Sequence, residues 1–255
     1  MSSILSRDQI KEAWEISVGH HRVSIIGTVS RETYLDPSFL NPLPDKVWAR
    51  LELFALDVLD ANSRVNLVSR KDPERQILDN ILDSVFLAVV LRAVPRETPN
   101  PSLLLDAGSG SGVPGIPIKL ILEEDQIQGG LILVDSVQKK ARVLSSLVSK
   151  LDLQSTEVFG DRFENPKLAE LCQKLGPDFD WILCSKAFAS TENTLAWSEA
   201  LKPRLKAAYL IKGPAGLAEV QGGIPKKYGW KVAQTYSFRF PHRESFVIEL
   251  TPRIG

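Results

Sequence analysis

Apolar residues recur at two different spacings along the chain, and the change of spacing divides it. In two early segments they fall every three or four positions, which predicts amphipathic helices. These positions are Val47, Leu51, Phe54 and Val58 in the first segment, and Ile77, Ile81, Leu82 and Val85 in the second. Asp72 and Pro73 supply an N-cap and a first-turn proline for the second helix.

From residue 103 onward, short apolar runs alternate with longer amphipathic segments. The runs that predict strands are 103–105, 131–135, 156–159, 180–184, 207–211, 230–240 and 245–250, and the segments that predict helices include 116–122, 138–150 and 194–201. The last two strands follow one another closely, so we expect a terminal hairpin. The alternation implies an α/β fold with a doubly wound, mostly parallel seven-stranded sheet covered by helices on both faces.

The same patterns predict three parts. Residues 1–43 are an extension that is partly helical, because Ser6 and Gln9 match a capping box before apolar residues at helical spacing. Three prolines within 36–44 predict a linker. Residues 44–95 form a small helical cap, 95–101 a connector, and 102–255 the α/β domain.

One stretch of the α/β domain has the composition of a ligand-binding loop. Residues 103–117 read Leu-Leu-Leu-Asp-Ala-Gly-Ser-Gly-Ser-Gly-Val-Pro-Gly-Ile-Pro. A strand ends near Asp106, and the alternate glycines Gly108, Gly110 and Gly112 precede a helix. Because glycine lets the backbone approach a ligand more closely than a Cβ would allow, this order predicts a cofactor cradle. The alternative is a tight turn in another kind of α/β protein.

The spacing within this loop favours S-adenosylmethionine over a dinucleotide. A dinucleotide site requires G-x-G-x-x-G, and here Val113 stands where the third glycine belongs. Asp106 would repel a pyrophosphate and attract the ammonium group of S-adenosylmethionine. Pro114 and Pro117 carry no N–H, so the loop has few donors for phosphate. We therefore predict S-adenosylmethionine as the cofactor, with a nicotinamide dehydrogenase as the alternative.

Further candidates for cofactor binding follow the predicted strands at their carboxyl ends, where ligands bind in open α/β sheets. Asp135 can accept hydrogen bonds from both ribose hydroxyls, or it can cap the next helix. Phe163 can pack against adenine and Glu164 can accept hydrogen bonds from backbone or base. The alternative for 161–164 is an ordinary capped loop.

Three basic residues are candidates for positioning a substrate. Lys186 follows the fourth strand and can steer a phosphate or carbonyl, or it can be a solvated lysine. Lys212 follows the fifth strand, and the turn residues after it would leave it facing the cleft. Arg243 precedes the last strand and can reach a phosphate.

Several other chemistries lack their motifs. The sequence has neither G-x-S-x-G nor a P-loop lysine pattern, and its three histidines suggest neither a metal cluster nor a triad, so no metal is expected. Cys184 lies inside an apolar strand and is interpreted as core. No Asn/Asp-Pro-Pro-aromatic stretch follows the fourth strand, which disfavours methylation of an exocyclic amine. Guanine N7 needs no deprotonation, so in-line positioning alone could serve its methylation, and no catalytic acid or base is predicted.

The charge of the chain is zero overall but uneven. Residues 201–255 hold ten Lys and Arg against three Glu, which indicates an anionic partner or, alternatively, a solvated surface. Two cysteines without a C-x-x-C pattern fit a reducing compartment. The N-terminus lacks the apolar core of a signal peptide, and the longest apolar run, 85–91, is too short for a membrane span. A cytoplasmic monomer without membrane contact is expected.

Taken together, these residues resemble the bacterial small-subunit ribosomal RNA (guanine-N7) methyltransferase family, also called glucose-inhibited division protein B. The resemblance covers about 44–255 and is most specific at 105–117, which is similar to the family's D-x-G-T/S-G-x-G-x-P-G-I-P. Leu-Val-Asp-Ser at 133–136 and Asp-Arg-Phe-Glu at 161–164 resemble its second-strand motif and its R-x-E loop. Asn66-Leu67, Asp72-Pro73 and Leu-Asp-Ser at 82–84 resemble its N-terminal helical signature.

The resemblance implies methyl transfer from S-adenosylmethionine to N7 of guanine 527 in the 530 loop of 16S rRNA, either free or within the 30S subunit. It implies that Gly108, Val113, Phe163 and Glu164 line the cofactor and that the residue after the fourth strand completes that site. Lys212 and Arg243 would belong to a basic cleft for RNA. The alternatives are a non-catalytic rRNA-binding assembly factor and a methyltransferase with another RNA target.

Three positions depart from the family's pattern. Lys186 stands where arginine is usual, and lysine lacks the bidentate fork of a guanidinium group. Asn80 stands where histidine is common, and Ser111 where proline is common. The first 40 or so residues have no counterpart in the resemblance.

Overall fold

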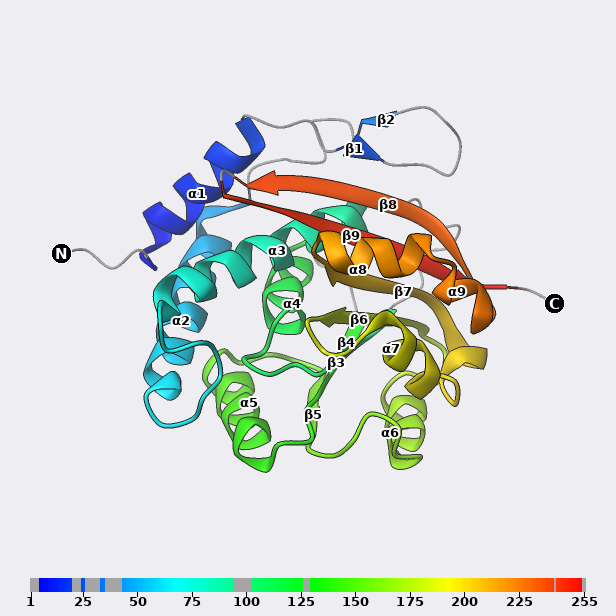
Figure 1. The fold of residues 1–255 in the computed structure, drawn as a ribbon. Coiled ribbons are helices and arrows are strands. Elements are labelled where there is room, and N and C mark those ends of the chain that lie inside the picture. Colours follow the sequence, from blue (N-terminus) through cyan, green and yellow to red (C-terminus); the bar gives the residue numbers. More distant parts are fainter. Residues whose placement is uncertain are drawn as a thin grey trace.

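A single sheet of nine strands, in the order β2-β1-β8-β9-β7-β6-β3-β4-β5, organises the molecule (Figure 1). The computed structural model describes residues 5–19, 24–25, 33–34, 43–93, 102–125, 129–240 and 242–253. The strands are β1 (Ser24–Ile25), β2 (Thr33–Tyr34), β3 (Ser102–Ala107), β4 (Gly129–Val134), β5 (Thr156–Phe159), β6 (Asp180–Lys186), β7 (Leu205–Lys212), β8 (Trp230–Phe240) and β9 (Arg243–Pro252).

Helices connect and cover the strands. They are α1 (Arg7–Gly19), α2 (Asp45–Asn62), α3 (Pro73–Ala93), α4 (Gly115–Glu124), α5 (Gln138–Lys150), α6 (Lys167–Leu175), α7 (Thr191–Trp197), α8 (Pro214–Gln221), α9 (Ile224–Lys227) and the 3₁₀ turn η2 (Lys202–Arg204). None of the described helices has the length and apolarity that crossing a membrane requires. The connector predicted at 95–101 and most of the linker predicted at 36–44 lie outside the described residues.

The predicted α/β sheet is confirmed. Strands β3 to β7 run parallel, and β9 pairs antiparallel with both β7 and β8 as the expected terminal hairpin. The two-residue strands β1 and β2 lengthen the β8 side of the sheet beyond the predicted seven, and β1 falls within 23–29, a segment whose apolar pattern allows a strand. The helix predicted at 194–201 is instead α7, which starts earlier because the Ser190 hydroxyl caps it by accepting the Asn193 N–H.

Strand β3 lies in the middle of the parallel part, and its composition reflects that position. It pairs with β4 on one side and β6 on the other, and all six of its residues are buried. Leu104 belongs to one apolar cluster, while Leu103 and Leu105 belong to another. A parallel strand covered on both faces needs apolar side chains at successive positions, which explains the unbroken leucine run.

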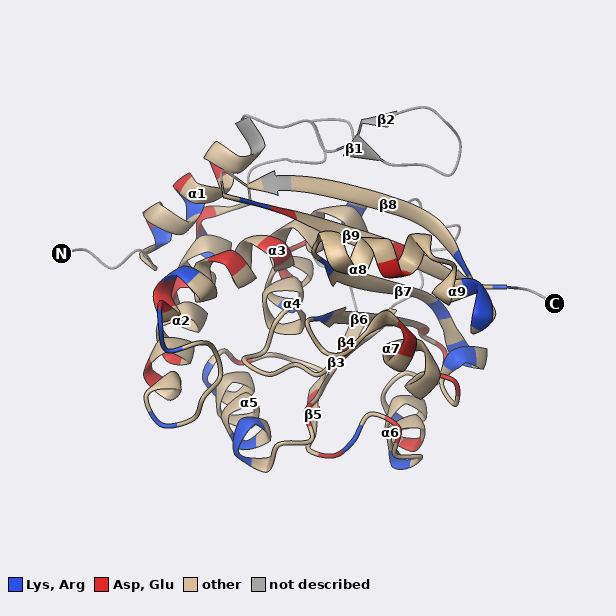
Figure 2. Cartoon of the chain, in the orientation of Figure 1, with Lys and Arg blue, Asp and Glu red and all other residues tan. Residues whose placement is uncertain are grey.

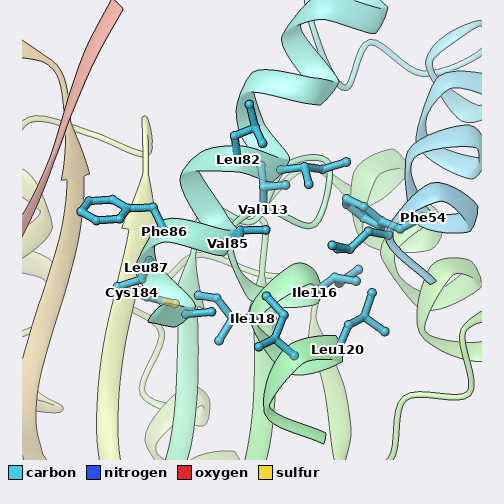
Figure 3. Close-up of a cluster of buried hydrophobic side chains, with 14 of the residues drawn as sticks. Phe54, Leu82, Val85, Phe86, Leu87, Val113, Ile116, Ile118, Leu120 and Cys184 are labelled. Atoms are coloured by element: carbon cyan, nitrogen blue, oxygen red, sulfur yellow. The ribbon is translucent and has the colours of Figure 1, made fainter. Parts of the chain in front are cut away.

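The helical cap packs over one face of this sheet. Phe54 from α2, together with Leu82 and Val85 from α3, lies in the same apolar cluster as Val113 and Ile116 of the glycine loop and α4 (Figure 3). This cluster contains residues from all three predicted parts, and the division of the chain into those parts stays a prediction.

Helix α1 joins the same side of the molecule. Its Trp14 stacks on Phe238 of β8 with ring centroids 5.5 Å apart, and Phe86 of α3 lies 4.6 Å from that ring. Strand β1 also pairs with β8. The N-terminal residues that are described therefore extend both the cap and the sheet.

A buried carboxylate fastens the cap to the end of the sheet near the glycine loop. The Asp83 side chain of α3 is 4% exposed, and its Oδ1 accepts a hydrogen bond from Arg243 Nη1 of β9 at 2.8 Å. Its Oδ2 lies 3.5 Å from Lys186 Nζ of β6. Lys186 Nζ also donates to Asn80 Oδ1 at 2.5 Å. One carboxylate thus links the cap helix to two strands.

Removing this carboxylate should weaken the fold. We expect Asp83→Ala to lower the free energy of unfolding by about 3–5 kcal/mol, because the mutation leaves the largely buried Lys186 without an acidic partner among the described residues and Arg243 with only Asp79, at 3.6 Å. The matched control is Asp60→Ala, which removes an exposed i,i+4 ion pair with Arg64 and should change stability far less, because such pairs contribute little. Urea unfolding measures the stability of both variants. Equal losses of stability would contradict the proposed role of Asp83 in linking the cap to the sheet.

Candidate active site

The three loop glycines have positive φ angles, and neighbouring atoms add a second constraint at two of them. The angles are +70° at Gly108, +55° at Gly110 and +95° at Gly112. A Cβ on Gly108 would lie 2.2 Å from the ring of Phe188, and one on Gly112 would lie 2.6 Å from Ile116. A Cβ on Gly110 would meet nothing closer than 3.8 Å, so this backbone faces open space.

Two carboxylates hold the loop in place. Asp106 is completely buried, and its Oδ2 accepts the Gly115 N–H at the start of α4 at 3.0 Å. Its Oδ1 has no hydrogen-bond partner among the described residues. Asp135 Oδ2 accepts the Gly110 N–H at 3.0 Å, and its Oδ1 accepts the Val137 N–H at 2.8 Å. The loop is therefore tied to the start of α4 and to the end of β4.

Burial changes the acid strength of Asp106. Desolvation raises the pKa of this carboxyl to about 7, and the hydrogen bond from the Gly115 N–H offsets part of the rise. The Ser109 hydroxyl donates to the Asp106 backbone carbonyl at 2.9 Å and accepts the Val134 N–H at 3.0 Å. Sequence reasoning missed this structural role of Ser109, because nothing local distinguishes a buried loop serine from a solvated one.

A cavity of about 480 Å³ opens beside the loop at the carboxyl ends of the strands. Aromatic rings form one wall, where Phe188 makes edge contacts with Phe163 at 5.9 Å and with Trp197 at 5.5 Å between centroids. Polar groups from the ends of β4 and β5 also line this larger cavity, namely Asp135, Ser136, Asp161, Arg162 and Glu164. It combines flat apolar surfaces with carboxylate acceptors.

A smaller cavity of about 170 Å³ adjoins the first one. Both are lined by Gly108, Gly110, Lys140 and Ala187, so these residues form the boundary between them. The cap contributes Leu67, Val68, Gln76 and Asn80 to the smaller cavity, and the sheet contributes Lys186. Ala187 has a φ of +52°, an unusual angle for a residue with a Cβ, at the junction of the two spaces.

Comparison with known proteins assigns the chain to a family. Residues 48–244 match the family described as rRNA small subunit methyltransferase G. The chain belongs to this family. A ribosomal RNA small subunit methyltransferase G from Klebsiella pneumoniae is 29% identical over 183 residues, which cover 72% of this chain and 77% of that protein. The protein of that name from Shigella flexneri is 30% identical over 66% of this chain and 70% of its own.

A solved structure supports the fold assignment. The magnesium protoporphyrin IX methyltransferase of Synechocystis, solved with bound SAH, matches with a TM-score of 0.51 and 15% identity. The match covers 82% of this chain and all of that one. This chain therefore has the same class of methyltransferase fold as the Synechocystis protein.

Most of the cofactor residues predicted from the sequence line the two cavities. The larger cavity includes Gly108, Gly110, Asp135, Phe163 and Glu164. The smaller cavity includes the two glycines together with Val113 and Lys186. Asp106 lines neither cavity. Its buried carboxylate accepts a backbone N–H, and this gives it a role in shaping the loop that the sequence interpretation as an ammonium ligand did not anticipate.

The two residues predicted to contact RNA, Lys212 and Arg243, lie outside both cavities. Lys212 Nζ donates to the Ala189 carbonyl at 2.8 Å, and burial lowers the pKa of this lysine while Glu219 opposes the change. Arg243 stacks 3.9 Å from the Phe240 ring centroid and donates to Asp83. Their contacts with RNA stay predictions.

The cap residues of the smaller cavity were not predicted as site residues. Gln76 Oε1 accepts the Ser69 N–H at 2.7 Å, and Asn62 Oδ1 accepts the N–H groups of Leu67 and Val68 at 2.8 and 3.0 Å. These bonds shape the loop between α2 and α3 that closes the cavity. Asn66-Leu67 in this loop belongs to the helical signature of the resemblance, but no local pattern shows that the loop meets the active site, because that contact arises from tertiary packing.

The raised pKa of Asp106 predicts a pH-dependent stability. Between about pH 4 and 7 the folded protein binds one more proton than the unfolded chain at this residue, so this contribution to stability falls as pH rises. From pH 5 to 7 the fall should be about 2 kcal/mol, and it should be largely complete by pH 8. The Asp106→Asn variant should lack this fall in stability, because asparagine does not titrate.

Thermal unfolding of both proteins across pH 5–8 measures the effect. The decisive quantity is the difference between the wild-type and variant curves, because the titrations of all other groups cancel in it. A difference that does not change with pH would contradict the assignment of the shift to Asp106.

Proposed function

We propose that this chain transfers a methyl group from S-adenosylmethionine to N7 of a guanine in small-subunit rRNA. The observation that carries the proposal is the pair of adjoining cavities that share the glycine loop as their boundary. A donor in the larger cavity and a nucleobase in the smaller one would meet at that boundary. Family membership favours guanine 527 of the 530 loop in 16S rRNA as the target, through the resemblance described above.

The larger cavity has the groups that an adenosine-containing donor requires. Each oxygen of Asp135 already accepts one backbone N–H, but a carboxylate offers about four acceptor positions, so ribose hydroxyls can still bind. The rings of Phe163 and Phe188 offer apolar surface for a base. The open backbone at Gly110 leaves room for close approach. When bound, S-adenosylmethionine supplies a methyl group on a positively charged sulfur.

The smaller cavity favours a nucleophile that can be methylated without first losing a proton. The described residues that line it include no carboxylate, histidine or thiol to act as a general base, and of its two lysines Lys186 is held by Asn80 and Asp83. Guanine N7 has a ring lone pair that accepts a methyl group without proton transfer. What remains for the protein is to align the base with the donor.

Lys186 is the residue best suited to orient that base. Lys186 lines the smaller cavity, and Asn80 and Asp83 of α3 hold its ammonium group. Lysine donates well to guanine O6, which lies on the same edge as N7, whereas adenine carries a donor there. This assignment makes Lys186 a positioning residue for guanine more than a cofactor ligand.

Methyl transfer from labelled S-adenosylmethionine to unmethylated 30S subunits, with mapping of the modified nucleotide, tests the proposal. We expect Lys186→Ala to lower kcat/KM by about 10- to 100-fold, because one base-specific hydrogen bond is lost, and to leave donor affinity unchanged. The matched control is Lys139→Ala, an exposed lysine on α5. Binding without transfer would indicate an assembly factor, and another modified site would indicate a different RNA target.

The glycine loop gives a separate test of the donor site. We expect Gly108→Ala to weaken S-adenosylmethionine binding at least about ten-fold, because the new Cβ would displace Phe188 and strain a backbone with φ of +70°. Gly213→Ala is the control, since a Cβ there meets nothing within 4 Å. Isothermal titration calorimetry measures both. Equal affinities in the two variants would remove the loop from the donor site.

Cellular location and oligomeric state are the two remaining predictions. An rRNA or 30S substrate implies a cytoplasmic location, where ribosomal subunits are made. A monomer fits the resemblance and stays a prediction, to be checked by light scattering.

A further inference from the structure

The end of the sheet opposite the glycine loop carries a groove of about 870 Å³. It lies where β6 and β7 begin and β9 ends, and five cations line it: Lys202, Arg204, Lys206, Lys231 and Arg253. Helix α9 lies beside this groove, because its Lys227 lines an adjoining cavity together with Glu199 and Lys202 of the groove, and the helix adds Lys226 and Lys227. Figure 2 shows basic segments at α9 and at the first residues of β7 and β8, gathered at this end. We call these seven residues the basic groove.

The basic groove accounts for the uneven charge of the sequence. Residues 201–255 contain ten Lys and Arg, and seven of them belong to this groove. The two predicted to bind RNA, Lys212 and Arg243, are engaged elsewhere with Ala189 and Asp83. The excess of positive charge in the C-terminal part therefore lies mainly away from the cavities of the active site.

Carboxylates neutralise only part of this charge. Lys227 pairs with Glu192 at 2.5 Å, Lys202 lies 3.4 Å from Glu199, and Lys206 lies 3.9 Å from Asp180 while its side chain stays 69% exposed. With Asp178, four carboxylates face seven cations.

Three of the groove's cations have no such partner. Lys226, Lys231 and Arg253 are exposed and have no acidic partner among the described residues. Their charge is available to an anion from solution, and they come from α9, from β8 and from the residue that follows β9.

The guanidinium group of Arg204 is held in a fixed position. It lies 5.2 Å over the ring of the buried Trp181 and donates to the Pro177 carbonyl. A planar cation fixed in this way at the surface is suited to phosphate, which it can bind through two parallel donors. The side chain thus combines exposure with a fixed direction.

The groove is too far from the active site to contact the target nucleotide. Strand β6 runs from Asp180 beside the groove to Lys186 at the smaller cavity. At about 3.3 Å per residue, the two ends lie about 20 Å apart. Any nucleic acid in the groove is therefore a different segment from the one that carries the target base.

We propose that the basic groove binds the phosphate backbone of a second segment of the rRNA substrate. The proposal rests on the proposed function, because it assumes that a folded rRNA delivers its guanine to the smaller cavity. RNA is favoured over an acidic protein because protein interfaces centre on exposed apolar anchors. The described large apolar residues that are exposed, Ile16, Leu53, Leu56 and Val137, all lie elsewhere in the fold.

The test is the double charge reversal Lys231→Glu with Arg253→Glu. We expect the KM for 30S subunits to rise about ten-fold, while kcat and the affinity for S-adenosylmethionine stay at the wild-type values. The dependence of log K on log salt for protein-free 16S rRNA should become shallower by about 1.5 to 2, the loss expected for two phosphate contacts. The glutamine pair Lys231→Gln with Arg253→Gln should give intermediate values and serves if the reversal does not fold.

The matched control reverses Lys139 and Lys167, which are exposed, lie on α5 and α6, and have no acidic partner among the described residues. A wild-type KM and salt slope in the groove variant would overturn the inference, and so would equal effects in both double variants. An effect on 30S subunits without one on protein-free rRNA would assign the groove to a ribosomal protein and also overturn it. Failure of the wild-type protein to methylate 30S subunits would instead refute the proposed function.

Discussion

The hydrogen bonds from the glycine-loop backbone to two carboxylates determine where the active site can form. Asp106 accepts the Gly115 N–H from below the loop, and Asp135 accepts the Gly110 N–H from its side. Both carboxylates extend from the carboxyl ends of neighbouring parallel strands, β3 and β4, which the sheet register keeps adjacent. The loop is thereby held in left-handed backbone conformations that leave Gly110 open to the larger cavity.

The second constraint is the packing of the cap against this loop. Val113 and Ile116 contact the apolar cluster that includes Phe54 and Leu82, so the cap cannot move without exposing the far side of the loop (Figure 3). The same contact places Asn80 beside the smaller cavity. Cofactor loop and substrate cavity thus depend on one apolar interface, which connects the stability of the cap to the shape of the site.

Charge is distributed between the two ends of the sheet according to burial. At the carboxyl end, Lys186 and Arg243 are largely buried and held by Asp83, and Asp79 also pairs with Arg243, so their positions are fixed and their charge is compensated. At the amino end, Lys231 and Arg253 remain exposed. A buried, paired cation orients a specific group, whereas an exposed one contributes salt-dependent attraction. The two ends are therefore suited to different parts of one large anionic substrate.

The sequence by itself determined the elements and the cofactor loop, because these depend on short-range patterns. The leucine run of β3 and the alternate glycines from Gly108 are local signals, and family membership followed from the same residues. Only the tertiary structure decided which side chains share a space. Asp83 meets Arg243 across 160 positions, and Lys186 meets Asn80 across 106. Such contacts arise from packing between distant elements. For that reason the sequence could not distinguish the paired cations Lys186 and Arg243 from the exposed cations Lys231 and Arg253.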